Sequence, residues 1–147
     1  MKEWYVETRF EYKGYPCVVI FQRMGHRCGY VGLPKGHKYY GLEEFMSEPL
    51  CDIECHWGLT YSRNYLVGQD DKDTWWIGFD CAHCTDLNDY ETALKYFKDK
   101  KSQEYIKNSQ NLDNEVRTNV DMYGYDISIK SLGYVMENCI EIVDQIC

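Results

Sequence analysis

The sequence predicts an α+β fold, an antiparallel β-sheet covered by a long C-terminal amphipathic helix. Two observations support it. Short apolar runs separated by glycine turns fill the first 80 residues, several with a period of two, and apolar residues near the C-terminus recur at steps of three and four. Strand-like runs therefore precede helical ones. With 147 residues, no internal repeat and no clear linker, we expect a single domain over residues 1–147.

The first predicted strands form a hairpin and a neighbour. Residues 4–10 alternate apolar and charged side chains, and Lys13-Gly14 is typical of a turn. A β-branched run at 17–21 is the expected partner, and 28–31 is a third short strand. The stretch that follows contains Pro34 and several glycines, which predicts a loop over 32–41, and residues 42–46 could form one helical turn.

Two further strands are predicted in the middle of the chain. Residues 52–61 alternate strictly, and residues 74–80 are almost continuously apolar, as in a central strand. Consecutive strands of a meander lie side by side. We therefore expect His56 and Asp80 to share one end of the sheet, although the register cannot be derived from sequence.

Helices are predicted in the C-terminal half. Residues 90–108 are rich in Lys, Glu and Tyr and favour a helix, whereas residues 111–125 are ambiguous. The last segment is clear, because an apolar stripe runs from Leu132 to Ile146. Ser131 is a candidate N-cap, with a start nearer Ile127 as the alternative.

Charge and hydropathy argue against several classes of protein. A net charge of −8 argues against stable binding to DNA or RNA, which needs a basic surface. No apolar run approaches the roughly 18 residues of a membrane span, and acids interrupt residues 1–7, so neither a membrane segment nor a signal peptide is expected. We therefore expect a cytoplasmic protein that binds no membrane. A small anionic ligand, a basic protein partner and a homo-oligomer all stay compatible with this composition.

The eight cysteines leave two readings open. A disulfide framework is not expected in a cytoplasmic protein. The pairs Cys51/Cys55 and Cys81/Cys84 have spacings that could hold zinc, although three intervening residues and a strand-like context fit a zinc knuckle poorly. The alternative is that the cysteines are small buried apolar residues.

One group of polar residues suits catalysis. His56, Asp80, His83 and Asp86 combine two imidazoles and two carboxylates, and the last three follow the apolar strand at intervals of three. Such a set suits a divalent metal and equally suits metal-free acid–base chemistry. The alternative is that both aspartates only cap the turn through hydrogen bonds to backbone N–H groups.

A second group suits an anionic ligand. Arg27, Lys35 and His37 lie in glycine- and tyrosine-containing loops, where they could contact phosphates, and Tyr39 or Trp57 could stack on a base. The usual phosphate-loop motifs GxGxxG and Walker A are absent. The alternative is two solvated basic loops.

Three stretches carry a resemblance. Residues 28–37, 56–62 and 78–83 read CGYVGLPKGH, HWGLTYS and GFDCAH. They resemble a family of small bacteriophage and prophage proteins whose members read GYVxxPxGH, HGGLTYS and GFDCAH and for which no activity is established. This chain departs from that pattern at Trp57, where glycine is usual, and at Thr85. The resemblance points to His37, His56, Asp80, His83 and Asp86 as the functional positions.

A phage origin implies a counter-defence role. By this analogy the chain resembles small proteins that sequester a nucleotide-derived immune signal, which is our first hypothesis. The second is a phosphodiesterase-like hydrolase that uses the His/Asp group. The third is an acidic inhibitor that binds a host defence effector. The sequence leaves open whether the protein is an enzyme, which cofactor it uses and whether it holds metal.

Overall fold

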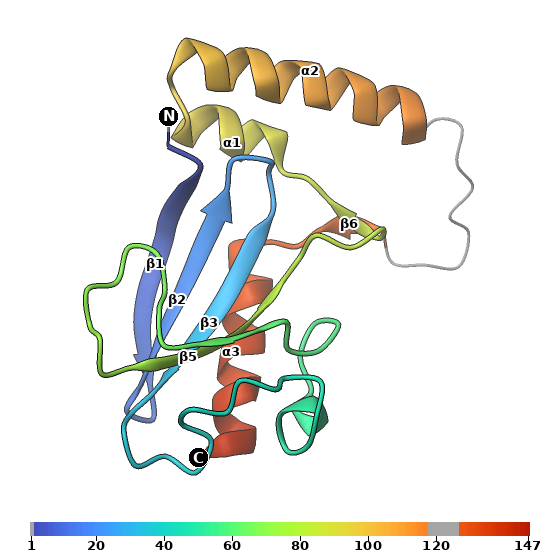
Figure 1. Cartoon of the computed structure of the whole chain (residues 1–147). Helices are drawn as coiled ribbons and strands as arrows, with labels where there is room; N and C mark the ends of the chain where they lie inside the picture. The colour runs from blue at the N-terminus through green and yellow to red at the C-terminus, as the bar shows by residue number, and fades with distance from the viewer. Residues whose placement is uncertain (1, 118–126) are drawn as a thin grey trace.

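The computed structural model describes residues 2–117 and 127–147 and has an α+β fold. Within these residues, five antiparallel strands form one sheet in the order β1-β2-β3-β5-β4, and three α-helices accompany it (Figure 1). The strands of this sheet are β1 (Trp4–Tyr12), β2 (Tyr15–Gln22), β3 (Arg27–Leu33), β4 (Tyr61–Arg63) and β5 (Trp75–Asp80).

The N-terminal strands confirm the sequence prediction. β1 and β2 form a hairpin closed by the pair Tyr12 and Tyr15. The two residues between them, Lys13 and Gly14, have φ values of 51° and 85°. Such positive values match the right-handed twist of a two-residue hairpin. β3 then pairs with β2 on the other side, as the third predicted strand.

The strand predicted over residues 52–61 is wrong. The chain forms a 3₁₀ turn, η1 (Leu50–Asp52), then a turn with left-handed backbone at Trp57 and Gly58, and enters the sheet only at β4. Its backbone N–H groups have mixed partners: Gln145 Oε1 of the C-terminal helix accepts from Glu54 at 2.7 Å, and the Gly78 carbonyl of β5 accepts from Thr60 at 2.9 Å. The buried side chains do not alternate, because Ile53, His56 and Leu59 are buried and Trp57 is exposed. The predicted helical turn at 42–46 is also wrong, since these residues form turns and coil.

β5 occupies the central position that its apolar composition predicted. It lies between β3 and β4, with Cys28 opposite Asp80 and Leu33 opposite Trp75. Close packing of these strands requires glycine: a Cβ atom on Gly29 would lie 2.5 Å from Cζ of Phe79. Asp80 is the last residue of β5, so the polar turn starts at the end of a rigid strand.

The helix predicted over 90–108 is in fact two helices, α1 (Tyr90–Tyr96) and α2 (Lys100–Arg117). Hydrogen bonds from nearby residues pair the polar groups at the break between the two helices. The Asp99 carboxylate accepts the Ser102 N–H at 2.9 Å, and the Gln103 amide donates to the carbonyl of Leu94 at 3.0 Å. Of the ambiguous segment 111–125, residues up to 117 belong to α2 and the remainder lies outside the described residues.

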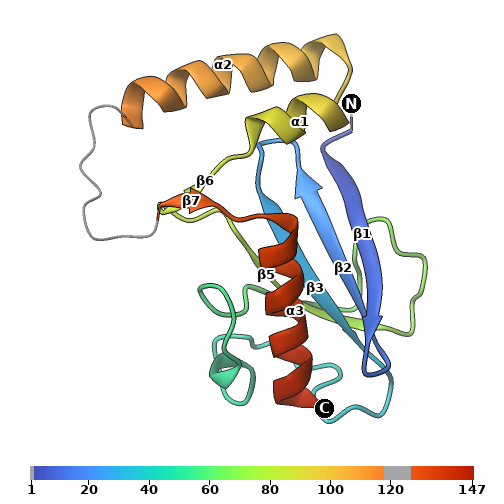
Figure 2. The same ribbon diagram turned by 180° about the vertical axis from the view of Figure 1, so that it is seen from behind.

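The C-terminal helix α3 (Leu132–Ile146) begins where predicted, with the Ser131 hydroxyl accepting the Tyr134 N–H. Its buried residues Val135, Cys139 and Ile142 belong to the same core cluster as the sheet residues Val19 and Val31. Figure 2 shows α3 lying against the β2 and β3 face of the sheet. None of the described helices has the length and apolar character needed to cross a membrane.

Two short parallel strands complete the described structure. β6 (Asp86–Leu87) follows the polar turn and pairs with β7 (Ser128–Ile129), which precedes α3 (Figure 2). The register places Asp86 opposite Ser128. This pairing joins the polar turn to the start of α3.

Candidate functional site

Two histidines distant in sequence meet at one carboxylate. His56 Nε2 lies 2.9 Å from Asp86 Oδ2, and His83 Nδ1 lies 3.0 Å from the same oxygen. The two imidazole ring centres are 5.4 Å apart. The structure therefore brings together three of the four residues that sequence analysis proposed for catalysis.

Asp86 is the centre of this cluster and is almost fully buried. Burial raises the pKa of its carboxyl group, but hydrogen bonds from His56, from the His83 backbone N–H and from the His83 ring outweigh that effect. The net pKa lies below the ordinary 3.8, so Asp86 is an anion at neutral pH. A buried cation lies beside this carboxylate, since Lys130 Nζ is 3.4 Å from Asp86 Oδ1.

Helix α3 holds the far side of His56. The Tyr134 hydroxyl lies 2.7 Å from His56 Nδ1, and Asn138 Oδ1 accepts the His56 backbone N–H at 2.8 Å. Sequence analysis missed Tyr134, Asn138 and Lys130. The first two stand four residues apart, so they share one face of a helix, and this spacing of polar side chains beside an apolar stripe was the available signal.

Asp80 is the fourth predicted residue and lies at the edge of the cluster. Its Oδ1 is 4.0 Å from His83 Nε2, and its Oδ2 accepts the Thr60 hydroxyl at 3.0 Å. Both aspartates also make the backbone hydrogen bonds of the alternative reading: Asp80 accepts the Ala82 N–H at 3.2 Å, and Asp86 accepts the His83 N–H at 3.0 Å. Capping and histidine contact therefore occur together.

Trp57 forms the outer wall of the cluster. Its ring stacks on His83 with centres 4.5 Å apart and planes 11° apart, yet the residue is 59% exposed. Its φ of 58° is left-handed, a conformation that glycine adopts readily and bulky residues avoid. A strained aromatic residue that presents its free surface beside two imidazoles suggests a binding role.

Arg27 lies near the cluster but is already engaged. Its guanidinium pairs with Glu7 at 2.6 Å and with Asp89 at 3.2 Å, and the side chain is buried. These acids raise the pKa of Arg27 against the lowering effect of burial. Each of its three nitrogens already donates inside the protein, to Glu7, Asp89 and the Lys130 carbonyl, so Arg27 is not positioned to contact a phosphate.

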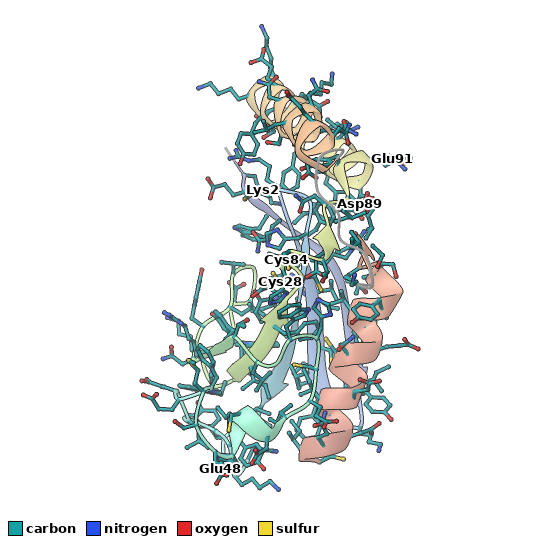
Figure 3. All side chains as sticks on the ribbon, turned by 90° about the vertical axis from the view of Figure 1, so that its right-hand side faces the viewer. Lys2, Cys28, Glu48, Cys84, Asp89 and Glu91 are labelled. Atoms are coloured by element: carbon teal, nitrogen blue, oxygen red, sulfur yellow. The ribbon has the colours of Figure 1, made fainter. Side chains whose placement is uncertain are left out.

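The other predicted ligand-binding residues lie at the opposite end of the sheet. Lys35, His37 and Tyr39 follow β3, whereas Arg27 begins it, and a seven-residue strand is roughly 20 Å long. Figure 3 shows Cys28 towards the α1 end, with Asp89, and Glu48 at the other end.

At that far end, His37 Nε2 lies 3.1 Å from the Ile146 carbonyl, and Lys35 pairs with Asp73 at 2.9 Å. His56 contacts Tyr134, about 18 Å from Ile146 along α3. The structure does not bring this group to the His/Asp cluster.

An open cavity of about 760 Å³ borders β4. Its lining includes Thr60, Arg63 and Tyr65 together with Glu43 and Glu44. Because the Thr60 hydroxyl donates to Asp80, this cavity adjoins the edge of the cluster. This cavity was not predicted from sequence, since its lining comes from three separate segments, residues 43–45, residues 60–67 and Trp75, which only the tertiary fold brings together.

The cysteines form no disulfide, and all eight thiols are free. Burial raises the pKa of Cys17 and Cys28 to about 12, as expected for small apolar core residues. Within residues 2–117 and 127–147, the group of side chains spaced to hold a metal ion is His56, His83 and Asp86, without a cysteine. The zinc pairs suggested by Cys51/Cys55 and Cys81/Cys84 do not form in this part of the chain.

Comparison of the chain with protein-family models, curated proteins and solved structures found no match.

Proposed function

We propose that this protein binds a nucleotide-derived immune signal at the Trp57–His83 surface and sequesters it, as a phage-type counter-defence protein. The observation that carries the proposal is the exposed Trp57 ring stacked on an imidazole that is hydrogen-bonded to a buried carboxylate. Stacking on an aromatic ring contributes about 1–3 kcal/mol per base and tolerates different bases. The motif resemblance supplies the biological setting.

Each part of the site has a role in this proposal. Trp57 stacks on the base, and His83 and Asp80 hydrogen-bond to sugar or phosphate groups. Asp86, which His56 also contacts, fixes the orientation of the His83 ring through its hydrogen bond to His83 Nδ1. Helix α3, as an amphipathic cover over one face of the sheet, keeps Tyr134 and Asn138 fixed against His56. The protein would act in the cytoplasm on a small molecule rather than on nucleic acid, consistent with its net charge of −8.

A binding panel tests the proposal. Purified protein is incubated with cyclic nucleotides and cyclic ADP-ribose isomers, freed of unbound ligand and heated, and the released molecules are identified by mass spectrometry. We expect one class of ligand to be recovered intact, and Trp57→Ala to weaken its affinity about 10-fold or more, in line with the loss of one stacked base. Absence of binding across the panel would contradict the proposal.

Tyr65 provides the matched control. It is also 59% exposed, but it lines the β4 cavity. Tyr65→Ala should leave the affinity unchanged. Loss of binding in Tyr65→Ala with normal binding in Trp57→Ala would move the site from the His/Asp cluster to that cavity.

A hydrolase is the second candidate, because a carboxylate that joins two imidazoles is suited to general acid–base chemistry. The two functions differ in one observable: a sequestering protein releases intact ligand on heating, whereas a hydrolase releases fragments. In that case His83→Ala should reduce turnover by about 10²-fold or more while Trp57→Ala mainly affects binding.

A further inference from the structure

We propose that His56, His83 and Asp86 bind a divalent transition metal, and that Zn²⁺ matches the donor set best. Two neutral imidazoles and one carboxylate are ligands typical of zinc and of other first-row metals. This inference adds an inorganic cofactor to the site. The metal site stands on the geometry of the cluster, and only its contact with a ligand phosphate rests on the proposed function.

Each of the three residues places one donor atom close to the other two. Asp86 Oδ2 is 2.9 Å from His56 Nε2 and 3.0 Å from His83 Nδ1, and all three atoms lie within 4.8 Å of one another. Ligands at about 2.0–2.1 Å from a tetrahedral zinc ion are about 3.3 Å apart. The two oxygen–nitrogen distances are shorter than this by a few tenths of an ångström, so a bound metal ion requires a small adjustment, and His83 is the more exposed of the two rings.

The hydrogen atoms can be placed consistently with a bound metal. A coordinating imidazole nitrogen carries no hydrogen, so the other ring nitrogen must donate to an acceptor. For His56, Nδ1 faces the Tyr134 hydroxyl oxygen at 2.7 Å. For His83, Nε2 faces Asp80 Oδ1 at 4.0 Å. His56 therefore has an oxygen within hydrogen-bond distance on its far side, the arrangement that orients metal-bound histidines, and for His83 the facing oxygen is a carboxylate beyond hydrogen-bond distance.

Lys130 does not occupy the metal position. Its ammonium group donates to the Ser128 carbonyl at 3.1 Å and to the Ser128 hydroxyl at 2.8 Å. Towards Asp86 it approaches Oδ1 at 3.4 Å, an oxygen that also lies 3.0 Å from His56 Nε2. Oδ2 is the oxygen that both imidazoles approach, at 2.9 and 3.0 Å, whereas the Lys130 ammonium group lies beside Oδ1.

A metal would supply the positive charge that the proposed ligand requires. Arg27 is paired with Glu7 and Asp89, and Lys35 lies at the other end of the sheet. Three protein ligands leave a fourth coordination position, and the His83 side chain is 20% exposed, so that position is reachable from outside. A phosphate oxygen would occupy it, with the base on Trp57.

Metal titration in the absence of any nucleotide tests this inference. Protein stripped with a chelator is titrated with Co²⁺ and followed by visible absorption, then with Zn²⁺ as competitor. We expect one Co²⁺ per chain, d–d bands of a tetrahedral nitrogen and oxygen site, no sulfur-to-metal charge-transfer band, and displacement by Zn²⁺. His83→Ala should weaken binding at least about 100-fold, since removal of outer-shell partners alone costs 10–100-fold.

Two variants keep the result interpretable. Asp80→Asn retains the cap on Ala82 but removes the carboxylate beside His83 Nε2, and should weaken Co²⁺ binding about 10-fold. His37→Ala removes a histidine outside the cluster and should bind as wild type. Absence of Co²⁺ and Zn²⁺ binding, unchanged binding in His83→Ala, or a thiolate band would overturn the metal site. Because no nucleotide is present, these outcomes are independent of the binding panel.

Discussion

Trp57 occupies a backbone conformation that its side chain does not favour. Its φ of 58° is followed by 80° at Gly58, so two consecutive residues are left-handed. In this chain the indole ring gains contact with His83 at the cost of backbone strain. That combination is expected where a side chain is retained for binding rather than for stability.

Two substitutions of Trp57 separate the contribution of the indole ring to binding from the backbone strain at positive φ. Trp57→Gly and Trp57→Ala both remove the ring, but only alanine keeps the strain at positive φ. We expect Trp57→Gly to be more stable than Trp57→Ala by about 1 kcal/mol in chemical denaturation, with both variants impaired in ligand binding.

Gly58→Ala is the matched control for the strain. Its φ is 80° and an added Cβ atom would meet nothing within 4 Å, so it should lose about the same 1 kcal/mol. Equal stability of Trp57→Gly and Trp57→Ala would contradict the strain argument.

At the scale of elements, the site depends on how closely β3, β5 and α3 pack. Gly29 lies on β3 under Phe79 of β5 and Cys139 of α3. A Cβ atom there would lie 2.5 Å from Phe79 Cζ and 2.9 Å from Cys139 Sγ. Displacement of α3 would also move Tyr134 and Asn138 away from His56. Packing in the core and geometry at the site are therefore linked through one helix.

We expect Gly29→Ala to destabilise the protein by about 1–3 kcal/mol through overpacking. Gly133→Ala is the comparison, because Gly133 lies in α3 and an added Cβ atom would be 4.0 Å from Ser131 Oγ. That change should stabilise the protein by about 0.5–1 kcal/mol, since alanine favours helix. Denaturant titration of both variants measures the two effects, and a Gly29→Ala variant as stable as wild type would exclude tight packing at this point.

At the scale of the whole molecule, the exposure of the eight cysteine thiols distinguishes the core from the surface. Cys17, Cys28, Cys81 and Cys139 are buried in the core, and burial raises their pKa values. Cys51, Cys84 and Cys147 are exposed, and Cys55 is intermediate. A thiol buried with a raised pKa reacts slowly with electrophiles.

Maleimide labelling of the folded protein should therefore modify Cys51, Cys84 and Cys147 first, with the core thiols reacting only after unfolding. Peptide mapping by mass spectrometry identifies the labelled positions. Rapid labelling of Cys17 or Cys139 in the native protein would contradict the packing of α3 against the sheet.

The sequence predicted those elements whose pattern and packing agree. β2, β3 and β5 are short apolar runs that are buried almost throughout, and the Ser131-capped α3 has an apolar stripe that is buried. The strand predicted at 52–61 failed because the alternation of apolar residues does not match their burial: Ile53, His56 and Leu59 are buried, whereas Trp57 is exposed. Hydrogen bonds to Gln145 and Asn138 of α3, which no local pattern contains, hold this segment as a loop.

The site residues likewise differ in whether they could be predicted: some are paired by local sequence, and others meet only through tertiary contacts. His83 and Asp86 are three residues apart and could be paired from sequence, and His56 was assigned to the same sheet end for a reason that proved wrong, since its segment is a loop. Tyr134 and Lys130 reach the cluster through α3 and the β6–β7 pair, whose register no local pattern contains. The basic group could not be resolved from sequence either, because its members follow opposite ends of one strand.

The most direct test of the account is to locate the ligand on the protein. Imidazole ¹⁵N resonances are followed by NMR while the protein is titrated with cyclic nucleotides and cyclic ADP-ribose isomers. The account predicts that the His83 and His56 resonances shift in a saturable manner and that His37 does not respond. Shifts confined to His37, with the two cluster histidines unchanged, would place the ligand at the opposite end of the sheet and contradict the account.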